Sequence, residues 1–227
     1  ETPLFAEIVS KRAVAKIPVA EVARRYPKEV VLSALLRMSE QAPFYIYTTF
    51  ALAYIKEHLH KTEGVGLTAV TVAAAIELVL IPTCGHLSDQ LGRKRVYATG
   101  TVLMAVVAFP FFLLLNTGTM GLIVLGVAII AVPHAMQYGP QASYIAENFP
   151  TGLAYGGSGL GYQAASLIAG GPAPLLATWM LPNFGWQAIS VYIIACAFLT
   201  GAAVVLLPDR SRESVPASPA LVQARQM

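Results

Sequence analysis

Charged residues are scarce in this chain. They make up 12% of its 227 residues, whereas 56% are hydrophobic and the mean hydropathy is +0.62. Soluble domains are about a quarter charged. The few charges gather in short stretches and leave apolar blocks of roughly 20 residues, the length of helix that crosses about 30 Å of hydrocarbon. The chain is therefore expected to lie in a lipid bilayer, with no nucleic-acid partner.

Other signals are missing as well. The two cysteines, Cys84 and Cys196, both fall inside apolar blocks, so they indicate neither a disulfide framework nor a metal site. His58 and His60 have no third ligand beside them, and no metal is expected. The chain contains no nucleophile triad, phosphate loop or cofactor motif, which argues against an enzyme and against a cofactor.

The apolar blocks predict an all-α membrane protein with six transmembrane helices. Their continuous hydrophobicity excludes the period-two alternation of a β-barrel, and helices satisfy their own backbone in lipid. A loop at residues 1–28 would precede the bundle at 29–207, and a polar tail at 208–227 is expected to be disordered. The expected spans are residues 30–55, 67–87, 96–115, 120–146, 156–181 and 186–207.

The distribution of Lys and Arg predicts the orientation, because short cytoplasmic loops accumulate these residues. With six spans, the leading segment, the loop at 93–95 and the tail lie on one side, and only Lys56 and Lys61 lie on the other. Both termini are therefore expected in the cytoplasm. The loop that contains Glu147 has no basic residue and adds no support.

The most specific motif is GHLSDQLGRKRVY, residues 85–97, between the second and third expected spans. A glycine at position 85 allows helices to approach closely, and Gly92 permits a tight turn. Asp89 is placed to face Arg93 in a charge-assisted contact. The alternative is an ordinary basic loop, because Lys94 and Arg95 follow directly.

This segment resembles the loop signature of the major facilitator superfamily, in the copy between the eighth and ninth helices. The resemblance implies that Gly85, Asp89, Gly92 and the basic residues Arg93, Lys94 and Arg95 form a cytoplasmic gating motif that latches two halves of a transporter. Gln90 stands where the signature often has a basic residue.

A narrower resemblance, to the metabolite:proton symporter branch of this superfamily, covers nearly the whole chain. It is carried by ETPLFAEI, FYIYTTFALAY, FPFFLLLNTG, YGPQASYIAENFPT and SGLGYQAASLIAGGPAPLLAT. The resemblance implies that the chain is the C-terminal six-helix half of a major facilitator fold. Its expected partners are a missing N-terminal six-helix half, the bilayer, a small-molecule substrate and protons, in a bacterial inner membrane.

Ionisable residues inside the expected spans are candidates for a substrate or proton pathway. Arg37 and Glu40 lie three residues apart and share a helical face. A charge near mid-membrane costs on the order of 2.5–3.5 kcal/mol, so it normally faces a cavity or a partner. Alternatively, Arg37 extends to the interface with Glu40 as its counter-ion. Tyr45 is expected on the same face, with simple aromatic packing as its alternative.

Glu77 lies in the middle of the second expected span among apolar residues, where a carboxylate must be protonated or paired. It is a candidate proton site. The alternative is a neutral carboxyl group that hydrogen-bonds to a neighbouring helix.

Polar residues recur beside Pro133 and Pro140 in the fourth expected span. Proline frees a backbone carbonyl, and transporters use such interrupted helices at binding sites. A cavity face is expected, with a hinge or helix-contact face as the alternative. In the fifth expected span, Gln163 is a possible ligand contact or an interhelical hydrogen bond. The residues of the fourth span that share this face are His134, Gln137, Tyr138 and Gln141.

These features predict a secondary transporter that takes up a small carboxylated or zwitterionic metabolite, coupled to protons, by alternating access. An exporter of drugs or metabolites from the same superfamily is the nearest alternative. A membrane subunit without transport activity is another, because six helices lack the opposite wall of a pathway.

Overall fold

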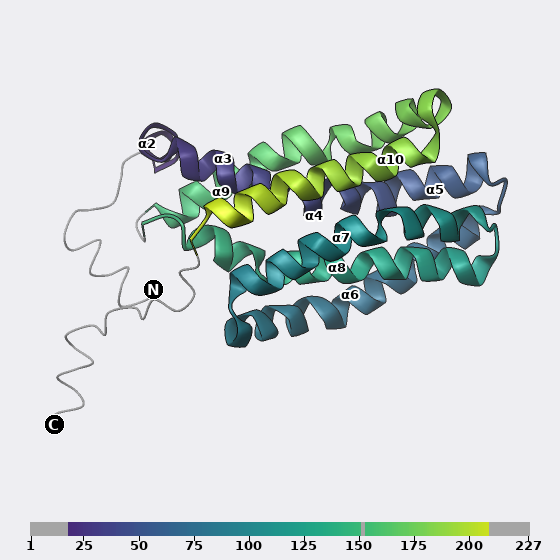
Figure 1. Cartoon of the computed structure of the whole chain (residues 1–227), viewed down its shortest axis with the longest axis horizontal. Coiled ribbons are helices and arrows are strands. Elements are labelled where there is room, and N and C mark those ends of the chain that lie inside the picture. The colour runs from purple at the N-terminus through teal and green to yellow at the C-terminus, as the bar shows by residue number, and fades with distance from the viewer. Residues whose placement is uncertain (1–17, 151–152, 209–227) are drawn as a thin grey trace.

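The computed structural model describes residues 18–150 and 153–208, and within these ranges the chain is helical and has no strand. Figure 1 shows a bundle of roughly antiparallel helices, with the first described helix and the last described residues at the same end. The α-helices are α2 (Pro18–Arg25), α3 (Pro27–Leu36), α4 (Met38–Tyr45), α5 (Ala51–Ala53), α6 (Glu63–Leu91), α7 (Arg93–Asn116), α8 (Met120–Ala146), α9 (Ala154–Ala165) and α10 (Pro172–Leu206). The π-helices are η1 (Ile46–Phe50), η2 (Tyr54–His58) and η3 (Ser166–Gly170).

Segment 27–58 is a series of short helical pieces. Pro27 occupies the start of α3, where its missing N–H costs nothing. Pro43 lies inside α4, and the wider turns of η1 follow directly after Tyr45. Proline removes one hydrogen bond from the helical ladder, and π-turns redistribute such bonds.

Helices α6, α7 and α8 are long and regular. Gly92 separates α6 from α7 with φ 100°, and Gly118 precedes α8 with φ 66°. Both angles lie in the region that glycine adopts without strain. These two glycines therefore allow the short reversals that set the three helices side by side.

The last helical segment is interrupted at Gly185. Residues Ala154–Leu206 form one apolar stretch of 53 residues, but Gly185 has φ 76° and ψ 175° inside α10. A helix cannot continue through these angles. The chain turns back there, at the end of the bundle opposite to α2 (Figure 1).

The prediction of an all-α membrane protein is confirmed, whereas the expected number of six spans remains a prediction. Four segments of the described chain are long and apolar enough to cross a membrane: Glu63–Leu91, Arg93–Asn116, Met120–Ala146 and Ala154–Leu206. The expected span at 120–146 coincides with α8. Most of the expected leading loop, residues 1–17, and nearly all of the expected tail, residues 209–227, lie outside the described residues.

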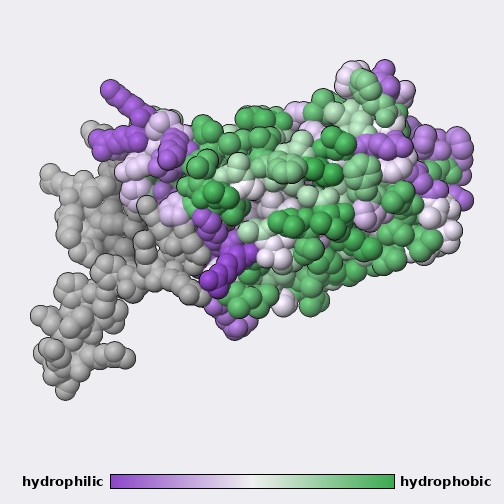
Figure 2. Space-filling view, in the orientation of Figure 1, coloured by the Kyte–Doolittle hydropathy of each residue, from purple (hydrophilic) through white to green (hydrophobic). Residues whose placement is uncertain are grey.

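Large apolar side chains lie both in the core and on the outside of the bundle. Tyr47, Phe111 and Phe112 are among the largest fully buried side chains, whereas Leu78 and Phe198 are more than 70% exposed. Figure 2 shows a broad apolar band across the visible face, with hydrophilic residues gathered towards its two ends. This arrangement suits a protein whose middle faces hydrocarbon.

Candidate functional site

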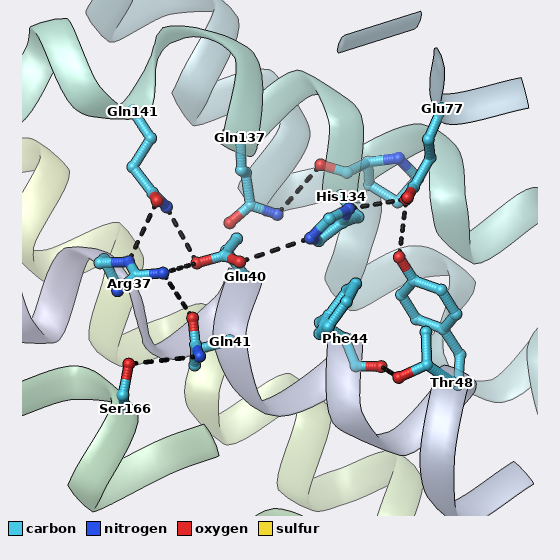
Figure 3. A network of polar contacts seen from close by, with 12 residues as sticks. Arg37, Glu40, Gln41, Phe44, Thr48, Glu77, His134, Gln137, Gln141 and Ser166 are labelled. Carbon is cyan, nitrogen blue, oxygen red and sulfur yellow. Dashed lines mark hydrogen bonds and ion pairs between the residues drawn. The ribbon is translucent and has the colours of Figure 1, made fainter. Parts of the chain in front are cut away.

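Three helices bring ionisable residues together inside the bundle. Glu40 comes from α4, Glu77 from α6 and His134 from α8, and Arg37 lies at the junction of α3 and α4. The four side chains lie along one connected set of polar contacts (Figure 3). Each residue is at most 9% exposed.

Arg37 is fully engaged. Its guanidinium pairs with Glu40 Oε2 at 3.1 Å and donates to Gln41 Oε1 at 2.5 Å and Gln141 Oε1 at 3.0 Å. It also donates to the backbone oxygen of Tyr162 at 3.0 Å. The guanidinium carbon Cζ lies 3.8 Å from the centre of the Tyr162 ring, in a cation–π contact. Only 4% of Arg37 is exposed. The alternative in which Arg37 extends to the membrane interface is therefore wrong, although Glu40 is its counter-ion.

His134 lies between the two carboxyl groups. Its Nδ1 is 2.7 Å from Glu77 Oε1, and its Nε2 is 3.4 Å from Glu40 Oε1. The hydroxyl of Tyr47 donates to the same Glu77 oxygen at 2.6 Å. The amide of Gln141 donates to Glu40 Oε2 at 3.0 Å. Glu77 is thus paired within the bundle rather than left alone in apolar surroundings.

A cavity of about 340 Å³ opens beside this cluster. Tyr138 stacks on His134 with ring centres 5.5 Å apart, and Phe44 stacks on the imidazole at 5.0 Å. Tyr138 is 45% exposed, so this ring connects the buried cluster with the surface. The wall residues of the cavity are Arg37, Glu40, Gln41, Phe44, Glu77, Ile81, His134 and Tyr138.

Three of the predicted pathway residues lie elsewhere. Tyr45 faces η3, where its ring is close to Gly170, and it does not line the cavity. Five residues after Glu40 correspond to about 140° around a helix, so a shared face was the wrong expectation. Gln137 is fully buried and donates to the carbonyl of Pro133 at 3.2 Å. Gln163 is exposed on α9 and does not line this cavity.

Tyr47, Gln41 and Tyr162 also contact the polar cluster. Tyr47 lies seven residues, or two turns, after Glu40, so its place on the same face was readable from spacing. Gln41 also contacts the hydroxyl of Ser166 in η3 at 3.4 Å. The contact between Arg37 and Tyr162 joins segments 125 residues apart, and no local pattern indicates it.

In the signature segment, Asp89 lies 3.0 Å from Arg93, as its spacing predicted, and Arg93 also pairs with Glu147 at the end of α8. Glu147, which gave no support to the predicted orientation, therefore forms an ion-pair cluster with Asp89 and Arg93. Lys94 donates to the carbonyls of Val205 and Leu207 at 3.3 and 2.6 Å. Gly85 of α6 faces Gly139 of α8, so the close helix approach predicted at Gly85 is between α6 and α8.

Comparison with known proteins identifies the family of this chain. The profile of the Major Facilitator Superfamily matches residues 31–224, which is most of the chain. The chain belongs to this superfamily. The resemblance drawn from the signature segment is thereby confirmed. The Major Facilitator Superfamily consists of transporters, not of enzymes, and the chain is an integral membrane protein.

Several curated relatives are bacterial transporters. The chain is 31% identical to the shikimate transporter of Escherichia coli (strain K12), over 87% of the chain and 46% of that protein. It is 26% identical to the proline/betaine transporter of the same strain, over 100% of the chain and 48% of that protein. It is 29% identical to the glycine betaine/proline/ectoine/pipecolic acid transporter OusA of Dickeya dadantii (strain 3937), over 88% and 42%.

The chain spans about half the length of the curated relatives it matches. No solved structure matches this chain.

Proposed function

We propose that this chain forms one half of a secondary transporter that takes up a small carboxylated or zwitterionic metabolite together with protons. The observation that carries the proposal is the buried cluster of Arg37, Glu40, Glu77 and His134 beside a cavity in an apolar bundle. Ionisable residues in membrane segments are costly, and they mark ion and substrate pathways.

Proton counting supports coupling to protons. An imidazole whose two nitrogens both face carboxylate oxygens needs a proton in each contact. Either His134 is an imidazolium between two carboxylates, or one carboxyl group is protonated beside a neutral ring. Both arrangements carry one proton more than a neutral ring with two carboxylates. That extra proton balances the charge of the cluster, since Arg37 then offsets the single remaining negative charge.

Loss of this proton would leave the cluster with a net negative charge inside an apolar bundle. One nitrogen of His134 would also face an oxygen with no hydrogen between them. Burying an uncompensated charge is expensive, so the deprotonated cluster is expected to need contact with water or with a cation. A change of access that closes the cavity is therefore favoured when the proton is bound, which is the requirement for symport.

The chemistry of the cavity supports the substrate class. Its volume of about 340 Å³ is at the small end of ligand pockets. Its wall carries a guanidinium, an imidazole, two carboxyl groups and a phenol, so a small charged or zwitterionic solute suits it better than a hydrophobic drug. Shikimate, proline and betaines, which the names of the relatives mention, fit this description.

We further propose that segment 27–58 and the two parts of Ala154–Leu206 on either side of Gly185 complete a six-span half. The opposite wall would come from a second six-helix half, and the substrate would lie between the two halves. Both termini would face the cytoplasm of a bacterial inner membrane, as the excess of basic residues near Arg95 supports.

The test is reconstitution of the complete protein in liposomes with a panel of organic acids, proline and betaines, with and without an inward proton gradient. We expect uptake of at least one member, stimulated by the gradient. Expulsion of hydrophobic cations, with no uptake from the panel, would favour the exporter instead. Absence of both activities in correctly inserted protein would favour a subunit without transport.

Glu77→Gln tests the proton site within the same assay. Glutamine resembles a protonated carboxyl group, so exchange of internal for external substrate should persist while accumulation driven by the gradient is lost. Glu57→Gln is the matched control, because Glu57 is exposed in η2 and lies outside the cavity wall. If Glu77→Gln still accumulates substrate with the gradient, Glu77 is not part of the proton site.

A further inference from the structure

A second, larger cavity lies on the outside of the bundle, away from the polar cluster. It is a groove of about 680 Å³ between α7 and the part of α10 that follows Gly185. Its walls are apolar, and the hydroxyl of Thr101 is turned to the carbonyl of Tyr97. Val102, Phe198 and Val205 in its walls are more than 60% exposed. This groove therefore lies in the apolar band that hydrocarbon covers.

The length of the groove matches one leaflet of a bilayer. Its wall residues on α10 extend from Ile194 to Val205, and twelve residues at 1.5 Å each span about 18 Å. Half of a hydrocarbon core of about 30 Å is about 15 Å. A single acyl chain is long enough to fill the groove from the surface to the middle of the membrane.

One end of the groove is basic. Lys94 connects the start of α7 with the last carbonyls of α10, so the Val205 end of the groove lies at the basic segment 93–95. Arg95 is exposed and lies four residues before Thr99, seven before Val102 and eleven before Val106. These positions share one face of a helix, which places Arg95 in line with the groove.

Arg95 is also the basic residue of this segment that is left for an outside partner. Arg93 is paired with Asp89 and Glu147, and Lys94 is occupied by backbone carbonyls. Across residues 18–150 and 153–208, no acidic side chain forms an ion pair with Arg95. A guanidinium at the end of an apolar groove is suited to a phosphate.

From this combination we propose that the groove is a binding site for an anionic phospholipid. One acyl chain lies between α7 and α10, and the headgroup phosphate contacts Arg95. The proposal is independent of what the protein transports. Bulk lipid without preference for charge, or a helix of a second copy, would be the other occupants, and the experiment separates them.

The experiment is native mass spectrometry of the complete protein in detergent, titrated with phosphatidylglycerol or phosphatidylcholine of the same acyl chains. A basic residue near the membrane surface contributes on the order of 1 kcal/mol towards an anionic lipid, which is about a fivefold preference. We expect this preference in the wild-type protein and its loss in Arg95→Gln. Lys61→Gln is the control: Lys61 lies just before the start of α6, at the other end of this helix from the segment 93–95, and this variant should keep the preference for the anionic lipid.

Gly201→Leu tests the groove itself. Gly201 lies in the groove, and nothing is within 4 Å of a Cβ placed there, so a leucine side chain would start in open space and occupy part of the groove. Binding of both lipids should be lost at this site. Gly121→Leu is the matched control, because Gly121 is equally open and lies at the other end of the bundle.

Four results would overturn the proposal. Equal binding of the two lipids by the wild-type protein would make Arg95 irrelevant, and so would a preference that survives Arg95→Gln. Wild-type lipid binding by Gly201→Leu would place the lipid elsewhere. A dimer that Gly201→Leu converts to a monomer, without a change in lipid binding, would identify the groove as a contact between copies.

Discussion

Gly139 lies at a close approach between α6 and α8, the two helices that carry Glu77 and His134. A Cβ at this position would lie 2.7 Å from the carbonyl oxygen of Ile81 and 2.8 Å from the amide nitrogen of Gly85. Both neighbours are backbone atoms, and ordinary contact begins at 3.4 Å. In Gly139→Ala, α6 must therefore move back by about 0.7 Å.

This displacement should reach the polar cluster. His134 lies five residues before Gly139 on α8, and Glu77 lies four residues before Ile81 on α6. The same movement would lengthen the contact between His134 and Glu77 from 2.7 Å to about 3.4 Å and so weaken this hydrogen bond. Overpacking typically costs about 1–3 kcal/mol, and the better helix propensity of alanine returns about 0.5–1 kcal/mol.

We expect a net loss of about 1–2 kcal/mol for Gly139→Ala, which corresponds to a decrease in Tm of about 2–8 °C for a chain of this size. Cys84 and Cys196 are both buried, so a thiol-reactive dye reports unfolding of the purified protein. Gly85→Ala is the matched control across the same crossing. Its Cβ would be 3.5 Å from the carbonyl oxygen of Gly139, an ordinary contact, and its Tm should be unchanged or higher. Equal Tm values for the two variants would refute this account of the crossing.

The remaining predictions concern the signature segment and the orientation. Asp89→Asn should impair uptake by the complete protein without loss of membrane insertion, because Arg93 loses one anionic partner and the balance between access states shifts; normal uptake at equal expression would leave Asp89 as part of a topology signal alone. Glu147→Gln should act in the same direction, since it removes the other partner of Arg93, and wild-type uptake would make that pair dispensable. A cysteine in place of His58 should react with an impermeant reagent from outside the cell and one in place of Arg95 should not; labelling of the latter from outside would reverse the topology.

The sequence was sufficient for elements whose cause is local. The span at 120–146 coincides with α8 because a continuous apolar block has only one way to satisfy its backbone in lipid. The contact of Asp89 with Arg93 follows from their four-residue spacing on successive turns. Glu77 and His134 stood out because an ionisable residue in an apolar block needs a partner.

Local spacing was not sufficient where several helices meet. Tyr45 was expected at the cavity, but the helical rotation turns it towards Gly170 and brings Tyr47 to Glu77 instead. Gln163 has the right chemistry for a ligand contact, yet it is exposed on α9 and remains a prediction. Gly185 lies between the expected spans 156–181 and 186–207, and only the structure shows that it divides α10 through a positive φ.

By itself, the sequence determined that this protein lies in a membrane and which blocks are helical. It also identified the ionisable residues whose burial in a membrane span costs enough free energy to require a partner or a cavity. Only the tertiary structure decided how these residues pair. Hydrophobicity and helical periodicity act over a few turns of one helix, whereas the pairing of Glu40 with His134 joins positions 94 residues apart. Such pairings depend on how α4, α6 and α8 are rotated and how closely α6 and α8 approach at Gly139, and both depend on packing across the whole bundle.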